Sequence, residues 1–582
     1  MPFAALACAP RLTMEQFELP KHLGLLVLAG VLLAGGAVPG PRTQPALLAW
    51  MAAVAASAVG ASAPSAAWLG DYENLEGVLT WACYAVLFLA GAGLDHGQAR
   101  RFRTAVVAAA CLGAAYALLQ QAGADPFRGE RFRHVRAFAG NPDFLAQQMA
   151  MAIPLLLARG AGGVPTLGPV GVFTCSAGGV FTVGAVGVFT LVLGLTASRG
   201  GLLGGIAGCV VALAPLPRTR PADAGRRWLG AAAAGAAGLL VAELLLPADL
   251  SLHGRLEDLA AGHGLARTRG IMWEGVARAA RERPLLGLGP DGLGAAFLRT
   301  APPGWADLEG LGTTARKAHD EPLHVLAIAG VAGLGAWAWL LAVAFRRPER
   351  DPAAVAALCA ALIHNLVGFS TAATAPVVWV LLGRLSSCKP EQDTPGVPVG
   401  TSGVSAYAET PKRAILVALG LMLAVFGAFR FSADAWAYRG NEAARAGAPG
   451  RATDAFLVAA RLAPWEATYL VRAASGLEQS GRPSDALPLY ERAAAFSPAD
   501  GIRLGHVGRV SFALASAARN RGARDEAYAT LLKAVALAPS QPSLYGAAIM
   551  AAQQLGNRAD VDRLVADLRA REPGWAQKML GR

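Results

Sequence analysis

Charged residues are scarce in this chain of 582 residues, because only 16% are Asp, Glu, Lys or Arg. Soluble globular proteins carry about a quarter, so the composition argues against a soluble protein. The seven cysteines are scattered, with no CxxC pair or other metal-binding spacing. Acidic residues such as Glu274, Asp291 and Asp307 are dispersed. The sequence therefore predicts neither a metal nor a cofactor, and the cysteines are expected to be small core residues.

Long apolar runs take the place of the missing charge, and 54% of the residues are hydrophobic. About 20 apolar residues cross the hydrocarbon core of a bilayer as a helix. The pattern predicts an all-α fold: a polytopic transmembrane bundle of about twelve spans over 22–431, with close packing at its many glycines. The runs fall at 22–38, 45–61, 75–94, 104–121, 144–158, 169–195, 199–216, 228–246, 321–345, 353–370, 374–388 and 412–431.

Arginine and lysine in short loops predict the orientation, since they favour the cytoplasmic side. Basic loops near 100–103, 218–227, 346–350 and 389–413 are therefore expected in the cytoplasm. Alternation places outside the segments 62–74 and 122–143, the turn at Ser198 and Arg199, the loop 247–320, everything after about 432, and the amino terminus. The tail 1–21 shows no signal-peptide pattern.

The segment 122–143 disagrees with this orientation, because it carries positive charge on the side predicted to be outside. Either the helix count is in error or the segment forms an anion-binding surface. The net charge of +12 is read first as cytoplasmic loops plus a basic outer surface. An anionic ligand is the second interpretation, and nucleic acid is not expected. The arginines concerned are Arg128, Arg131, Arg133 and Arg136.

After a Pro/Gly/Ser-rich linker at 386–411 and the last apolar run, the composition becomes Ala-rich and amphipathic. An Ala is followed four residues later by a bulky residue and twelve residues later by a Pro. This pattern resembles tetratricopeptide repeats over 435–572, so 435–582 is expected to be a helical-repeat domain that offers a surface to a protein partner. An inert helical cap is the alternative. The three sets are Ala452, Phe456 and Pro464; Ala486, Tyr490 and Pro498; and Ala527, Leu531 and Pro539.

The 247–320 loop is far longer than an ordinary connection, and such loops tend to carry binding and catalysis. It holds Arg267 and Arg269, then Pro-Leu-Leu-Gly-Leu-Gly at 284–289, and it ends at His319. Arg199 lies between two apolar runs, where its charge is costly unless it faces a cavity or a partner. Converging guanidinium groups suit a diphosphate, and one imidazole can accept a proton. Taken singly, each residue is more often structural.

The order of these motifs resembles the O-antigen ligase and polymerase superfamily over about 135–385. Ser-Arg at a span start precedes a long outer loop with Arg…Trp and Pro-Leu-Leu-Gly-Leu-Gly, and then Ala-His. Gly-Asn-Pro at 140–142 and Ile-His-Asn at 363–365 are further matches. Two positions depart from the family pattern, because Asp320 and Asp143 stand where Asn is usual. These carboxylates add negative charge near a predicted anion site, or raise the basicity of the histidine.

The resemblance implies a membrane glycosyltransferase that moves a glycan from a polyprenyl-diphosphate carrier to an acceptor hydroxyl without a metal and with inversion. It makes His319 the general base, Arg199 and Arg269 diphosphate contacts, and Arg136 and Arg267 candidates for the donor pocket. It also implies the inner (plasma) membrane of a bacterium, with the loop and the repeats in the periplasm. The acceptor is lipid A core, another glycan or a protein, and the sequence does not choose among them.

Two other functions remain open on the sequence. A polysaccharide or lipid transporter (flippase) would use the arginines to line a path and the repeats as a docking arm, which Gly/Pro-interrupted spans fit. A scaffold would use the membrane part as an anchor only, although about twelve spans exceed what anchoring needs.

Overall fold

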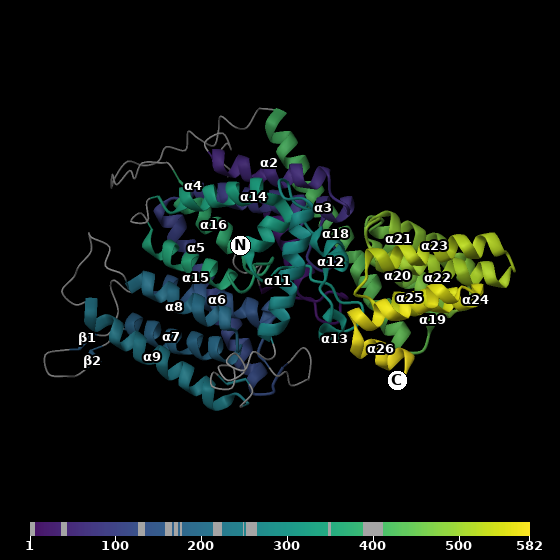
Figure 1. Cartoon of the computed structure of the whole chain (residues 1–582). Helices are drawn as coiled ribbons and strands as arrows, with labels where there is room; N and C mark the ends of the chain where they lie inside the picture. The colour runs from purple at the N-terminus through teal and green to yellow at the C-terminus, as the bar shows by residue number, and fades with distance from the viewer. Residues whose placement is uncertain are drawn as a thin grey trace.

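A computed structural model gives the fold of the chain. It describes residues 6–36, 44–125, 134–157, 166–167, 173–174, 177–213, 224–247, 250–251, 265–346, 351–387 and 411–581. The fold is helical apart from the two-residue strands β1 (Thr166–Leu167) and β2 (Phe173–Thr174), which pair antiparallel. The predicted all-α class is therefore confirmed. Figure 1 shows a bundle of purple to green helices with a yellow-green stack of helices at its side.

Every predicted apolar run contains a helix in its described part, although the run 169–195 also contains β2. Among the described residues, α5, α14 and α18 are long and apolar enough to cross a membrane, and seven further apolar helices are shorter. The total of about twelve spans thus remains a prediction. The helices are α1 (Glu18–Ala34), α2 (Pro45–Val59), α4 (Val78–Gly93), α5 (His96–Gln121), α6 (Pro142–Leu157), α7 (Ala177–Leu195), α8 (Arg199–Leu213), α9 (Ala224–Leu245), α14 (Glu321–Ala344), α15 (Pro352–Asn365), α16 (Ala375–Leu385) and α18 (Pro411–Arg445).

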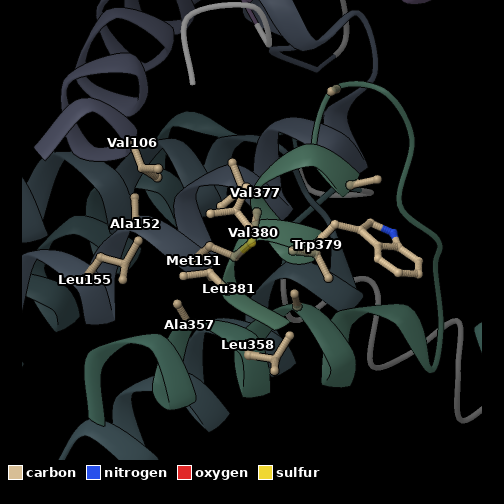
Figure 2. Packing of buried hydrophobic residues seen from close by; sticks show 14 of the residues in the cluster. Val106, Met151, Ala152, Leu155, Ala357, Leu358, Val377, Trp379, Val380 and Leu381 are labelled. Atoms are coloured by element: carbon tan, nitrogen blue, oxygen red, sulfur yellow. The ribbon is translucent and has the colours of Figure 1, made fainter. Parts of the chain in front are cut away.

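Glycines let these helices approach each other closely, as small residues do in membrane bundles. At the crossing of α1 and α18, a Cβ placed on Gly30 would lie 2.7 Å from the carbonyl oxygen of Gly420. The centre of the bundle is filled by aliphatic side chains around α16, which Figure 2 shows from close by. Those labelled there are Val106, Met151, Ala152, Leu155, Ala357, Leu358, Val377, Trp379, Val380 and Leu381.

Ion pairs and hydrogen bonds join described loop segments at the two ends of the bundle. At one end, here called the site end, Arg316 pairs with Asp71 and Lys317 pairs with Glu76. At the opposite end, Arg103 contacts Asp351 at 2.9 Å, and Arg384 donates to the carbonyl of Leu94. The side of the membrane that each end faces remains a prediction. Arg128, Arg131 and Arg133 lie outside the described residues.

The described part of the 247–320 loop folds into a small helical unit at the site end, here called the outer unit. It comprises α11 (Leu265–Glu282), α12 (Leu293–Thr300) and α13 (Trp305–Glu309), and it has its own apolar core. Val276 and Phe297 are fully buried there, and the ring of Phe297 packs edge-on against Trp305 at 4.8 Å. In Figure 1 the outer unit lies between the bundle and the helical stack.

The Pro-Leu-Leu-Gly-Leu-Gly motif joins the outer unit to the bundle by its backbone. Helix α14 is broken at Gly330, whose φ is 65°. The amides of Val331 and Ala332 donate to the carbonyls of Pro284 and Leu285, and the amide of Leu288 donates to the carbonyl of Ala327. Because a helix interrupted inside a bundle must satisfy its freed backbone groups, the motif supplies what the break removes.

The predicted repeat domain is a stack of short helices. Helix α18 runs without a break from the bundle to this stack. The predicted boundary near 431–435 therefore falls inside this helix, and the predicted linker at 386–411 lies almost wholly outside the described residues. Alanines of the repeat pattern are buried, as Ala452, Ala486 and Ala527 show. The stack comprises α19 (Pro449–Leu462), α20 (Ala467–Gln479), α21 (Pro483–Ala495), α22 (Gly501–Ala517), α23 (Arg521–Leu537), α24 (Pro542–Leu555), α25 (Arg558–Arg571) and α26 (Pro573–Leu580).

The C-terminal helices of the stack form hydrogen bonds with the outer unit. Gln541 forms two hydrogen bonds to the backbone at Gly312 and Thr313. Asp307 accepts hydrogen bonds from the amides of Gly574 and Trp575 at 2.9 and 2.8 Å. Leu298 of α12 belongs to the apolar core of the stack. The outer unit is thus held by the bundle on one side and by the repeats on the other.

Candidate functional site

Arg199, Arg269 and His319 come from three separate elements. Arg199 is the first residue of α8, Arg269 lies in the second turn of α11, and His319 immediately precedes the cap of α14. All three side chains are half-buried. Arg199 contributes to the pKa of Arg269, and Arg269 contributes to the pKa of His319. Arg269 is thus the electrostatic link between the other two residues, and their catalytic roles remain predictions.

His319 is held in an uncommon backbone conformation by its neighbours. Its φ is 51°, in the left-handed region that few residues other than glycine adopt. The indole of Trp273 on α11 donates to the carbonyl of Ala318 at 2.8 Å, and Asp320 caps α14 through the amide of Leu323. The ring of His319 meets that of Phe369 edge-on at 4.8 Å. Such strain persists only where the surroundings impose it, and it is frequent at functional sites.

The imidazole of His319 is neutral at physiological pH. Burial lowers its pKa to about 4, the positive charges of Arg269 and Lys317 act in the same direction, and the Asp143 carboxylate opposes them. An imidazole with this pKa is unprotonated across the neutral range and is therefore able to accept a proton. Proton transfer to it would be favoured if a bound anion offset the neighbouring positive charges.

Arg269 shares its surroundings with a second arginine and one carboxylate. Burial lowers the pKa of Arg269, Asp143 raises it, and Arg199 lowers it. The first turn of α6 brings Asp143 here, where Asn141 accepts a hydrogen bond from its amide at 2.8 Å. Two guanidinium groups with a single carboxylate leave an excess of positive charge in a half-buried place, which is the electrostatic requirement of a diphosphate site.

Polar side chains of α6, α15 and the segment after α15 form a hydrogen-bonded network beside this site. The side-chain amide of Gln147 donates to Asn365 at 2.8 Å and to Ser370 at 3.0 Å, and Asn365 also donates to Ser370 at 2.9 Å. His364 contacts the side-chain oxygen of Asn365 at 3.1 Å. Gly200 of α8 packs against His364, so this network lies directly beside the turn that carries Arg199. The sequence reasoning missed Gln147, although a glutamine inside an apolar span is a recognisable signal.

A buried ion pair supports the segment that leads to His319. Lys317 and Glu76 are only 5% and 6% exposed. The ammonium of Lys317 also lies 3.3 Å from His324 and over the ring of Phe369. This pair was not foreseen as part of the site, because its two members lie far apart in the sequence.

The sequence also predicts Arg136 and Arg267 as candidates for the donor pocket. Arg136 precedes a 3-10 turn (η3, Ala137–Ala139), and its amide donates to Gln120 of α5. Arg267 lies on α11 but is exposed. Glu274, on the same helix, pairs with Arg278 at 2.5 Å, which is the structural role expected for it. Roles for Arg136 and Arg267 in donor binding remain predictions.

An apolar groove runs along α8 from the turn that bears Arg199. Side chains of α6, α7, α8 and α9 line it, and Thr190 is its single polar side chain. The cavity volume is about 240 Å³. A groove of this composition, open to the apolar surface of the bundle, suits a hydrocarbon chain. Its lining includes Ile153, Leu193, Leu202, Ile206 and Leu239.

Residues 184–338 match the family model described as O-Antigen ligase. The resemblance predicted from the sequence is thereby confirmed. The matched segment contains Arg199, Arg269 and His319, the groove-lining part of α7, α8 and α9, and the outer unit. The match of this segment to the O-antigen ligase family model supports a membrane glycosyltransferase type of function at the level of the family.

Solved structures with similar regions include helical-repeat proteins. YrrB, described as a TPR protein with an unusual peptide-binding site, has 18% identity and a TM-score of 0.22 over 30% of this chain and 83% of its own. MamA of AMB-1 has 19% identity and a TM-score of 0.21, over 26% of this chain and 88% of its own. The Cut9-Hcn1 hetero-tetramer of the APC/C has 12% sequence identity and a TM-score of 0.25, over 86% of this chain and 88% of its own. Scores this low support no conclusion, and no curated protein matches the chain.

Within the described ranges, no group of three or more His, Cys, Asp and Glu side chains is arranged to hold a metal ion.

Proposed function

We propose that the protein is a membrane glycosyltransferase that transfers a glycan from a polyprenyl-diphosphate carrier to an acceptor hydroxyl at the site end of the bundle. The observation that supports this most is the pairing of two guanidinium groups with a neutral imidazole. Arg199 lowers the pKa of Arg269, and Arg269 lowers the pKa of His319. A leaving diphosphate and a proton acceptor are the two things that such a reaction needs.

In the proposed reaction His319 takes the proton of the acceptor hydroxyl. The acceptor oxygen forms a bond to the anomeric carbon, and the bond from that carbon to the diphosphate oxygen breaks. The diphosphate departs with the bonding electrons, and Arg199 and Arg269 stabilise the charge that grows on it in the transition state. The proton remains on His319 until it is released to water, so atoms and charges balance without a further reactant.

The apolar groove gives the carrier a place in this scheme. A polyprenyl chain lying along α8 would bring its diphosphate to the amino end of that helix, which carries Arg199. The positive end of the helix dipole favours an anion at the same position. The proposed site would therefore bind the two parts of a lipid-linked donor in two places. The hydrocarbon chain would lie between α6 and α9, and the diphosphate would lie at the arginines. The bacterial inner membrane, with the site end toward the periplasm, is the location that this donor requires.

Substitution of the two arginines tests the proposal. Arg199→Ala and Arg269→Ala are expected to abolish transfer from the lipid-linked donor while the protein remains inserted in the membrane. The matched control is Arg278→Ala, an exposed arginine of α11 paired with Glu274, which should transfer normally. Undiminished transfer by both site variants would refute the assignment. Purified protein with lipid-linked donor and acceptor separates an enzyme from a transporter, because only an enzyme joins them.

A deletion strain identifies the reaction within this class. Accumulation of full-length lipid-linked glycan would indicate a ligase, and accumulation of single repeat units would indicate a polymerase. The acceptor proposed from the family is lipid A core, a growing glycan or a protein hydroxyl.

A further inference from the structure

A cleft lies where the bundle, the outer unit and the repeat stack meet. Its walls come from the loop that follows α2, from α12, from the segment 312–316, and from the turns between α19 and α20 and between α21 and α22. Small residues line much of it, including Ala63, Gly294 and Ala467. The segment 312–316 continues directly to Lys317, Ala318 and His319. The cleft is distinct from the arginine site, but it borders the segment that leads to His319, the proposed base.

Asp291 lines the cleft, and one of its two carboxylate oxygens has no hydrogen-bond partner among the described residues. Asp291 is 8% exposed, and its Oδ2 accepts hydrogen bonds from the amides of Asp71 and Glu76 at 2.8 and 2.9 Å. Its Oδ1 is buried and has no hydrogen-bond partner among the described residues. Asp291 is held there with a φ of 51°, which is unfavourable for a residue with a side chain. A buried acceptor left unpaired is costly, so it points to a ligand or water that donates to it.

An unpaired donor lines the same cleft. The indole nitrogen of Trp465 is buried and has no acceptor among the described residues. One face of this indole stacks on Phe426, with the ring centroids 4.9 Å apart. Phe496 lines the cleft as well. Trp465 and Phe496 therefore bring aromatic side chains to the cleft that Asp291 also lines.

The charges that line the cleft are already compensated. Arg316 pairs with Asp71, Arg503 pairs with Asp500, and the carboxylate of Glu466 faces Arg430 at 3.5 Å. Asp291 is a further carboxylate, so the sum of these charges is negative by one. No lining arginine is left for an anionic ligand, and an acidic sugar or a phosphate is disfavoured.

We propose that this cleft binds a neutral saccharide portion of the acceptor, with Asp291 and Trp465 as the two hydrogen-bonding residues. A sugar hydroxyl both donates and accepts, so a saccharide can supply the donor that Oδ1 of Asp291 lacks and the acceptor that the indole of Trp465 lacks. The apolar face of a pyranose packs on aromatic rings, as amphipathic ligands do. A peptide fits less well, because turns rather than a strand edge or a concave helical face line the cleft. The acceptor role rests on the proposed function, whereas saccharide binding does not.

Equilibrium binding to the full chain in lipid nanodiscs tests the proposal without turnover. The probes are the neutral and acidic oligosaccharide fractions released by mild acid from the surface glycan of the producing cells, and tryptic peptides of their envelope proteins. The neutral fraction should bind saturably, and Asp291→Asn and Trp465→Phe should each weaken it about ten-fold, as expected for loss of a hydrogen bond to a buried polar group. Asp485→Asn, an exposed carboxylate of the stack paired with Arg482, should bind as the wild type does.

Several results would overturn the proposal. These are the absence of saturable binding by the neutral fraction, binding that neither variant weakens, and variant-sensitive binding by the acidic fraction or by peptides alone. Trp465→Phe decides the question if Asp291→Asn does not fold. Saccharide binding by a protein that transfers nothing would refute the proposed function and keep this inference. Transfer with an acceptor KM unchanged in both variants would refute the acceptor role of the cleft alone.

Discussion

The side chain of Gln541 pairs with the backbone of Gly312 as a neighbouring strand would. Its Oε1 accepts from the amide of Gly312 at 2.8 Å, and its Nε2 donates to the carbonyl of Thr313 at 3.1 Å. Gln541 is fully buried, and it lies at the start of α24 in the repeat stack. The segment that it holds continues through Arg316 to His319. The repeats are therefore mechanically connected to the proposed base.

Replacing Gln541 with leucine should loosen this connection. Gln541→Leu removes two part-buried hydrogen bonds, each of which contributes about 0.5–1.5 kcal/mol. The carbonyl of Thr313 keeps its hydrogen bond from the indole of Trp305. Faster hydrogen exchange in the peptides covering 304–316 is the expected result. Gln554→Leu, an exposed residue of the same helix, serves as the control and should exchange as the wild type does. Unaltered exchange in Gln541→Leu would show that the stack does not hold the outer unit in place.

Gly330 should tolerate no side chain. Its φ of 65° costs about 1–2 kcal/mol for a residue with a Cβ, and that Cβ would collide with the carbonyl of Leu285. Gly330→Ala is expected to lower the thermal unfolding temperature in detergent and to release the 284–289 motif. Gly335→Ala is the control, because it lies in the same helix with open space around its Cβ position. It should be neutral or slightly stabilising. Equal melting of the two variants would disprove the role assigned to the break.

Lys317 and Glu76 should show strong coupling. Removing one member of a buried ion pair leaves an uncompensated charge and costs about 3–5 kcal/mol. Lys317→Met is therefore expected to be strongly destabilised, and Lys317→Met combined with Glu76→Gln should recover much of the loss. A double-mutant cycle on the free energy of unfolding measures this. Additive effects of the two substitutions would mean that the pair contributes no coupling.

The pKa of His319 should move in opposite directions in two variants. Arg269→Ala removes a positive charge that lowers the pKa, so the value should rise from about 4 toward the ordinary 6.5. Asp143→Asn removes a carboxylate that raises it, so the value should fall. Only the neutral imidazole reacts with diethyl pyrocarbonate. The pH at which modification of His319 is half-maximal, followed by mass spectrometry, should therefore shift upward in the first variant and downward in the second.

This measurement does not depend on turnover. Arg278→Ala is again the control, since its guanidinium is exposed and paired with Glu274. A shift in the same direction in both variants would contradict the electrostatic arrangement around His319. If His319 is the base, the acid limb of kcat/KM in Asp143→Asn should follow the same downward shift.

The sequence predicted the helices of the bundle well, because each apolar run is a local property of about 20 residues. The grouping of loops by Arg and Lys remains a prediction, because much of the basic loops 218–227, 346–350 and 389–413 lies outside the described residues. Arg199, Arg269 and His319 were predicted from motif order. Gln147, Glu76 and Asp291 were not foreseen as parts of functional sites, because their roles depend on partners far away in the chain. The fit of Pro284 and Leu285 into the break at Gly330 was equally hidden, since it is made by backbone atoms.

Asp143 shows how a departure from a motif becomes interpretable only in three dimensions. The sequence left open whether this carboxylate weakens an anion site or raises the basicity of the histidine. In the structure Asp143 raises the pKa of both Arg269 and His319. It therefore favours the charged form of the arginine and makes the imidazole a stronger base than it would be without this carboxylate.

The uninterrupted helix α18 also sets a distance. Its 35 residues extend about 50 Å at 1.5 Å per residue, whereas the hydrocarbon layer is about 30 Å thick. In a membrane crossed by α18, the surplus of about 20 Å carries the repeat stack beyond the hydrocarbon layer. In the proposed reaction, a donor moving within the bilayer and an acceptor arriving from the aqueous side would therefore approach the site end from different directions.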